Sequence, residues 1–156
     1  MDFKKTFEEF IDTLIREDGS DLHLASGRVP AVRVNGELVF LANHQILTQQ
    51  DVAGILESIL SPEHYKHFLA VQELDFSYQY QGTTRLRGNA FVQQGSYVVV
   101  LRLIPHVKTL QELNLPESLA EFTRRKQGFF LVVGPVGQGK SATMSSMVGL
   151  INEERA

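Results

Sequence analysis

The chain has 156 residues, of which 43% are hydrophobic and 21% are charged, and its formal net charge is −3. This length accommodates one ordinary domain, or a small domain and part of another. The weak negative charge gives no reason to expect a nucleic-acid partner, and the lack of cysteine excludes disulfides and Cys-ligated zinc.

The first expected element is an amphipathic helix. Apolar residues recur at three- and four-residue spacing over Phe3–Arg16, which predicts one buried helix face. We expect Gly19 to end this helix in a left-handed cap. The segment Met1–Lys5 does not lead into the apolar core of a signal peptide, and no apolar run approaches the roughly 18 residues of a membrane helix. A cytoplasmic location is therefore expected.

Short strands come next. Ser20–Leu24 alternates polar and apolar residues, which is typical of a half-buried strand. Two more short strands, around Val32–Val34 and Leu38–Phe40, are joined by Asn35-Gly36, a strong hairpin signal. His23 is interpreted as a packed or hydrogen-bonded residue of the first strand, with a role as ligand or switch as the alternative.

Two further helix starts carry capping signals. Thr48–Asp51 resembles a capping box with Asp in place of the usual Glu. Ser61-Pro62 combines an N-cap serine with a proline at the first helical position, and we expect that helix to run to about Ala70.

Three longer strands are predicted over Glu73–Tyr80, Thr84–Gln93 and Ser96–Ile104. Gly88 interrupts the apolar pattern of the second, and we expect it to loosen that strand. Antiparallel strands with three helices predict a compact α+β domain over residues 1–104 that folds by itself.

Residues 105–116 are predicted to form a linker, in which Thr109–Glu112 caps a short helical turn. A helix is predicted over Pro116–Lys126, and its basic last residues favour the helix C-terminus. A second domain is expected to begin at residue 117 and to occupy residues 117–156.

The most specific motif is Gly134-Pro135-Val136-Gly137-Gln138-Gly139-Lys140-Ser141, which fits the phosphate-binding pattern G-x-x-x-x-G-K-[ST]. The apolar run Phe129–Val133 before it has the length of a buried strand, and Ala142–Glu154 after it is predicted to be a helix. Strand, glycine loop and helix are the context that the motif requires. The helix is expected to bury four apolar side chains, Met144, Met147, Val148 and Ile151.

This motif predicts a nucleotide site. Glycines let successive backbone N–H groups point at phosphate, and the helix N-terminus adds its unpaired N–H groups. Lys140 supplies a positive charge for the β- and γ-phosphates, and Ser141 supplies a hydroxyl for Mg²⁺. The alternative is a chance match, which the flanking strand and helix patterns disfavour.

The rest of an ATPase core is not expected in this chain. A strand as apolar as Phe129–Val133 is typical of a parallel sheet, whose other strands would need long crossover connections. Glu153 and Glu154 lie roughly 18 Å or more along the helix from Ser141, too far to hold the same metal ion. We therefore expect no catalytic residue in this chain.

These segments together resemble a known family, the secretion ATPases of type IV pili and type II secretion, and most closely its PilT-like twitching-motility (retraction) branch. The resemblance covers essentially the whole chain and rests on motifs in the family's order. They are Ser20–Leu24, Gly27, Pro30, Arg33, Asn35-Gly36, Glu73–Ser77, Arg85, Arg87, Asn89, Leu101–Pro105, Leu113–Pro116 and Gly134–Ser141.

The resemblance implies a PAS-like N-terminal domain, the start of a RecA-like α/β ATPase domain and a hexameric ring that binds ATP and Mg²⁺. It implies that Arg87 and Arg102 of one subunit help to complete the nucleotide site of the next; their alternative is cross-strand pairing on the surface. It also implies an inner-membrane platform protein as partner and a position at the inner face of the cytoplasmic membrane.

Some residues depart from the family's pattern. Its usual loop reads G-P-T-G-S-G-K-S-T, and here Val136, Gln138 and Ala142 replace Thr, Ser and Thr. Because Ala142 lacks a hydroxyl that could reach the α-phosphate, we expect weaker binding. The family's Walker B, acidic and histidine segments lie beyond Ala156, so this chain alone is not expected to hydrolyse ATP. The alternatives are a pilus-assembly or type II secretion ATPase, and a non-enzymatic interaction module with a remnant loop.

Overall fold

The computed structural model describes residues 2–155. The chain divides into two compact units, Met1–Pro105 and His106–Ala156, and each is described by itself. Within the described residues, no helix is both long enough and apolar enough to cross a membrane.

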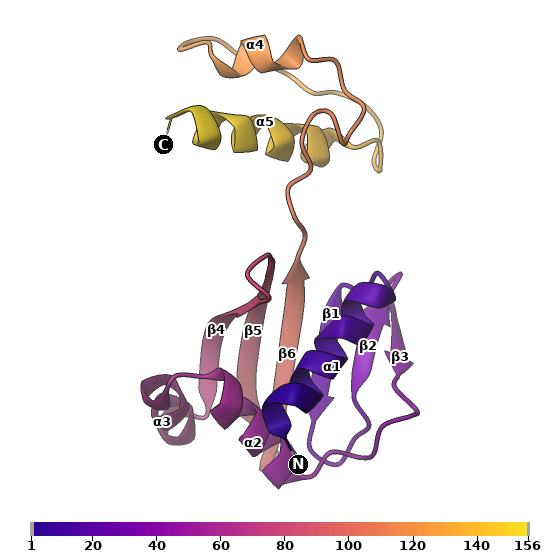
Figure 1. The fold of residues 1–156 in the computed structure, drawn as a ribbon, viewed down its shortest axis with the longest axis vertical. Helices are drawn as coiled ribbons and strands as arrows, with labels where there is room; N and C mark the ends of the chain where they lie inside the picture. The colour runs from indigo at the N-terminus through magenta and orange to yellow at the C-terminus, as the bar shows by residue number, and fades with distance from the viewer. Residues whose placement is uncertain (1, 156) are drawn as a thin grey trace. The chain divides into compact units, whose positions relative to one another are not determined.

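The first unit is built on one six-stranded sheet in which all neighbouring strands are antiparallel (Figure 1). The strand order is β3-β2-β1-β6-β5-β4, so β1 and β6 pair in the middle although they lie far apart in sequence. The strands are β1 Asp21–Ala25, β2 Ala31–Val34, β3 Glu37–Phe40, β4 Glu73–Tyr80, β5 Thr84–Gln93 and β6 Ser96–Ile104. The predicted antiparallel sheet is thus confirmed.

The helices of this unit begin where the sequence predicts. They are α1 Phe3–Arg16, α2 Gln49–Ile59 and α3 Pro62–Val71. Thr48 and Asp51 form the reciprocal hydrogen bonds of a capping box, and Ser61 Oγ accepts from the His64 N–H. The hairpin at Asn35-Gly36 has positive φ at both residues, as a tight two-residue turn requires.

One face of the sheet is covered and the other is open. Figure 1 shows α1 lying across the sheet, and the apolar faces of α1 and α2 share one buried cluster with the strands. Its fully buried side chains include Phe7, Phe10, Ile11, Leu14, Leu22, Leu24, Val32, Leu56, Leu86, Val99 and Leu101. Side chains at alternate strand positions point away from this core, and they form the open face of the sheet.

The end of α1 differs from the prediction. Asp18, with φ 50°, is the residue in the left-handed conformation, and Gly19 is not. Gly19 donates to the Leu14 carbonyl at 2.8 Å, and a Cβ on it would lie 3.1 Å from the Arg33 carbonyl oxygen. A Cβ would also lie 2.7 Å from Leu14 Cδ1, so glycine favours the close approach of this turn to Leu14 and Arg33.

The expectation that Gly88 loosens β5 is wrong. Gly88 lies directly opposite Phe76 of β4, and any Cβ on it would overlap the Phe76 ring. The ring therefore occupies the space that a side chain on β5 would take. Its exposed fraction is 8%, so the glycine allows a large side chain to be buried.

The second unit has two helices, α4 Leu119–Thr123 and α5 Lys140–Arg155. Before them, Thr109 and Glu112 cap a single turn with reciprocal hydrogen bonds of 2.7 and 3.2 Å, as predicted. The helix α4 is shorter than the predicted Pro116–Lys126, because the residues before it form i→i+3 hydrogen bonds, such as that from Leu119 N–H to the Pro116 carbonyl at 3.1 Å.

The strand predicted over Phe129–Val133 is wrong for this structure. These residues have no regular secondary structure, and the exposed fractions of Phe129, Leu131 and Val133 are 100%, 79% and 84%. A strand needs a neighbour to hydrogen-bond with its backbone, and none of the described residues pairs with this run.

The buried face predicted for α5 is only partly correct. Met147 is buried and Ile151 is half-buried, but Met144 and Val148 are 55% and 53% exposed. Among the described apolar side chains of this unit, only Leu110 and Met147 are buried, so no whole face of α5 is covered.

Candidate phosphate loop and arginine pair

The loop before α5 has the conformation that its glycines allow. Gly134, Gly137 and Gly139 have φ of 154°, 84° and 78°, values that L side chains rarely adopt. No other atom lies within 4 Å of where a Cβ would be on Gly137 or Gly139. These glycines are therefore needed for backbone conformation and not for packing, and the surface of the loop stays open to a ligand.

The side chain of Lys140 closes the loop. Its ammonium donates to the Pro135 carbonyl at 2.6 Å across the loop. At the start of α5, the Thr143 N–H donates to the Gly139 carbonyl at 2.9 Å. The Thr143 hydroxyl donates to the same oxygen at 3.0 Å. The N–H groups at the start of a helix have no intrahelical acceptor, so Lys140, Ser141 and Ala142 can present theirs to an anion.

The described residues hold no cluster of three or more His, Asp or Glu side chains that would bind a metal ion. The acidic end of α5 is used differently: Glu154 accepts a bifurcated hydrogen bond from the single Nε–H of Arg124 and another of 2.9 Å from an Arg124 terminal nitrogen. This ion pair joins α5 to the residue that follows α4. Glu154 therefore has a structural role in this unit.

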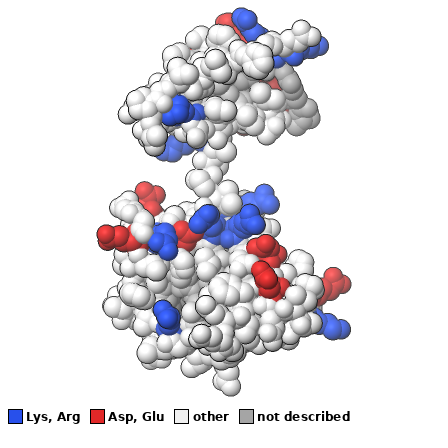
Figure 2. Space-filling view, turned by 180° about the vertical axis from the view of Figure 1, so that it is seen from behind, with Lys and Arg blue, Asp and Glu red and all other residues white. Residues whose placement is uncertain are grey.

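In the first unit, the two candidate arginines are cross-strand partners. Arg87 of β5 lies directly opposite Arg102 of β6, and Asp21 of β1 lies directly opposite Arg102 on its other side. All three project from the open face of the sheet. Figure 2 shows Lys and Arg side chains gathered on this face of the first unit, with Asp and Glu side chains beside them.

Asp21 anchors this group. Its exposed fraction is 3%, and it accepts hydrogen bonds from Arg102 Nε at 2.8 Å and from the Ser20 hydroxyl at 2.7 Å. Arg33 Nε lies 3.6 Å from Asp21 Oδ2, the oxygen that accepts from Ser20. Burial alone raises the pKa of the Asp21 carboxyl, but the hydrogen bonds from Ser20 and Arg102 and the Arg102 charge bring that pKa below its usual value.

Each arginine keeps donors for another partner. Asp21 uses only Nε of Arg102, whose side chain is 72% exposed. Arg87 makes a 3.7 Å ion pair with Asp75 in which both side chains are well exposed, and such a pair is weak in water. Arg85 lies opposite Ile104 and takes no part in this group. The terminal nitrogens of Arg102, which Asp21 does not use, and the weakly paired guanidinium of Arg87 can therefore contact an anion.

The sequence did not identify Asp21 as the counter-ion of Arg102. The β1–β6 pairing brings Asp21 against an arginine 81 positions later in the chain, and no local pattern signals that contact. The alternating pattern of Ser20–Leu24 shows that the side chains of Asp21 and Leu22 point to opposite faces of the sheet. Only the strand register shows which residue Asp21 contacts.

Comparisons with known proteins bear on the whole chain. No protein-family model matches it. It is 35% identical over 141 residues to the "type IV pilus retractation ATPase PilT" of Pseudomonas aeruginosa, and 30% identical over 148 residues to the "type IV pilus ATPase PilU" of the same organism. These alignments cover 90% and 94% of this chain. The chain is related to the PilT-like twitching-motility ATPases. The resemblance found in the sequence is confirmed.

The relation to PilT extends to structure. A crystal structure of the pilus retraction motor PilT with bound ADP matches with a TM-score of 0.72 and 38% identity, over 93% of this chain and 43% of that one. The Legionella pneumophila ATPase DotB matches with a TM-score of 0.69 at 22% identity, which shows a shared fold. The chain spans about two fifths of the length of its PilT and PilU relatives, 41% and 38%.

Proposed function

We propose that this chain is the nucleotide-binding portion of a PilT-like motor subunit that couples ATP hydrolysis to pilus retraction. The observation that carries the proposal is the glycine loop, in which positive φ at Gly137 and Gly139 keeps an open backbone surface at the start of α5. The relatives named as pilus ATPases support it. In this proposal the loop binds ATP, and Mg²⁺ is held through Ser141.

Residues 1–104 form a PAS-like domain in this proposal, residues 105–116 form a linker, and residues 117–156 begin a RecA-like ATPase domain. The subunit works in a cytoplasmic hexameric ring at the inner face of the membrane, against an inner-membrane platform protein. This chain binds nucleotide weakly by itself and does not hydrolyse it, since no group in it is expected to activate water.

Binding is tested with the 156-residue chain and Mg²⁺-ATP, followed by NMR of backbone amides. We expect saturable shifts at Gly137 and Gly139 that adenosine does not cause, because the loop recognises phosphate. Lys140→Ala should abolish them. Lys126→Ala, which removes a lysine of the same unit outside the loop, should leave them unchanged.

The absence of ATP-induced shifts at the loop would refute nucleotide binding and favour the alternative, an interaction module with a remnant loop. Equal shifts with adenosine would show that the loop does not recognise phosphate.

We further propose that Arg87 and Arg102 contact the phosphates bound by a neighbouring subunit. Their adjacent positions on β5 and β6 and the exposure of Arg102 support this role. The test mixes Arg102→Gln and Lys140→Ala subunits of a protein that carries the complete ATPase domain. Each variant alone should be inactive, and mixed rings should regain turnover, because some sites then combine an intact loop with an intact arginine. Failure of mixing to restore activity would exclude action in trans.

A further inference from the structure

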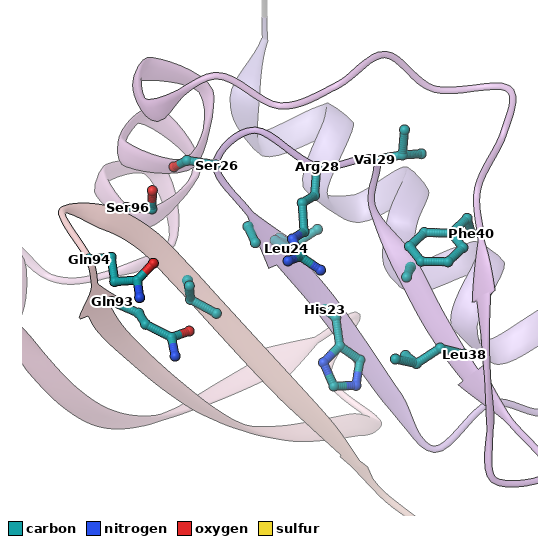
Figure 3. A pocket seen from close by; sticks show the side chains of 13 residues that line it. His23, Leu24, Ser26, Arg28, Val29, Leu38, Phe40, Gln93, Gln94 and Ser96 are labelled. Carbon is teal, nitrogen blue, oxygen red and sulfur yellow. The ribbon is translucent and has the colours of Figure 1, made fainter.

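A hollow of about 340 Å³ lies in the first unit, and it shares no residue with the phosphate loop or the arginine pair. Its volume is at the lower end of the range for small-molecule sites. It is lined by residues from β1, β2, β3, the turn after β1, and the β5–β6 hairpin. Figure 3 shows that the His23 ring and the Arg28 side chain both point into it.

His23 leaves a polar atom without a partner in this hollow. Its Nε2 is buried and has no hydrogen-bond partner among the described residues. A buried polar atom without a partner costs about 1–3 kcal/mol, so native structures usually satisfy it with protein, water or a ligand. The ring of His23 is packed, as predicted, but none of the residues 2–155 forms a hydrogen bond with its Nε2.

The charge in the hollow is also unbalanced. Arg28 is the only Lys, Arg, Asp or Glu that lines it, and among residues 2–155 its side chain has no ion pair or hydrogen bond. Burial and the charge of Arg33 lower the pKa of His23, against a smaller opposing effect of Asp21. At neutral pH the imidazole is therefore uncharged, and the hollow carries one positive charge.

The walls differ in polarity. Leu38 and Phe40 of β3 form one side, and their exposed fractions are 45% and 59%. Gln93, Gln94 and Ser96 of the β5–β6 hairpin form the other side (Figure 3). One side can thus pack against an apolar body, while the floor and the other side offer hydrogen bonds.

We propose that this hollow binds a small organic carboxylate, which Arg28 and the Nε2–H tautomer of His23 hold, with the apolar body of the ligand against Leu38 and Phe40. One guanidinium and one neutral imidazole match a single negative charge and the two oxygens of a carboxylate. A phosphate dianion would leave one charge unbalanced and would gain nothing from the apolar wall. In this proposal the first unit binds a ligand of its own, separate from the phosphate loop of the second unit.

The test uses benzoate as probe, with benzamide and inorganic phosphate as matched controls. NMR of the histidine ring nitrogens in the 156-residue chain reports on His23 Nε2 directly. We expect a saturable shift of that nitrogen with benzoate and none with benzamide or phosphate. Arg28→Gln should weaken benzoate binding at least tenfold, whereas Arg16→Gln, on the exposed side of α1, should leave it unchanged.

Three results would overturn the proposal. Benzoate that causes no saturable shift would show that the hollow is not a carboxylate site. Equal binding of benzamide would show an apolar site that does not recognise charge. A His23 shift that depends on the protein concentration and not on benzoate would show that a second copy of the chain covers the hollow. Unchanged backbone shifts elsewhere in Arg28→Gln verify that this variant folds.

Discussion

Both units of this protein contain a capping box, at Thr48–Asp51 in the first and at Thr109–Glu112 in the second, with hydrogen bonds of similar length. Their apolar segments, however, differ sharply. In Met1–Pro105, six strands pair and bury a continuous core. In His106–Ala156, the run Phe129–Val133 is as apolar as any of those strands, yet it remains exposed and unpaired.

This contrast separates two kinds of interaction. Caps and tight turns are completed within a few residues, so they form in either unit whatever surrounds them. A strand depends on a partner that is distant in sequence. The first unit supplies those partners, as β1 shows by pairing with β6. Among the described residues, the second unit supplies none.

The largest difference in stability is expected when an apolar side chain is truncated in each of the two units. Phe10→Ala removes a ring that is 1% exposed and should lower the free energy of unfolding by about 3–5 kcal/mol. Leu131→Ala, at 79% exposure, should change it by less than about 0.5 kcal/mol. Urea unfolding followed by far-UV circular dichroism measures both. A cost above about 1 kcal/mol for Leu131→Ala would mean that the run is packed in solution.

A smaller effect is expected from the ion pairs. Asp21→Asn weakens a buried acceptor that joins β1 to β6 and should cost about 1–3 kcal/mol. Glu154→Gln breaks a more exposed pair with Arg124 and should cost less, because water screens that pair. Chemical denaturation at neutral pH measures the difference. Equal costs would contradict the assignment of Asp21 as the buried anchor of Arg102.

The same pair predicts a pH dependence. Because the pKa of Asp21 is lowered in the folded state, its contribution is present above the ordinary carboxyl pKa and is lost as the pH falls through the folded value. The stability gap between wild type and Asp21→Asn should therefore close on acidification below about pH 4. A gap that persists at lower pH would show that the cost is steric.

The smallest effects are expected from the caps. Thr48→Ala removes the N-cap of α2, whose inner face is buried, and should cost about 1 kcal/mol. Thr109→Ala removes the cap of a single turn. It should cost only a few tenths of a kcal/mol, since no long helix depends on this cap. Thermal unfolding compares the two variants. A larger cost at Thr109 would show that this turn supports more of the second unit than α4 and α5 suggest.

Much of the fold follows from local patterns. The sequence predicts α1, the Asn35-Gly36 turn, the N-caps of α2 and α3 and the bounds of β4, β5 and β6. The errors at Gly19 and Gly88 share a cause: each glycine was interpreted from its neighbours in sequence. At both positions a Cβ would meet another part of the chain, the Arg33 carbonyl at Gly19 and the Phe76 ring at Gly88.

For the candidate sites the division is similar. The phosphate-loop pattern is local, so consecutive residues identify it, and its glycines have the positive φ that such a loop needs. Consecutive residues likewise determine the caps, the tight turns and the alternation that points Asp21 and Leu22 to opposite faces. Only the tertiary structure decides that Asp21 meets Arg102 and that His23 and Arg28 share one hollow. The physical reason is that these contacts depend on strand register and pairing, which chain segments far apart in sequence fix together.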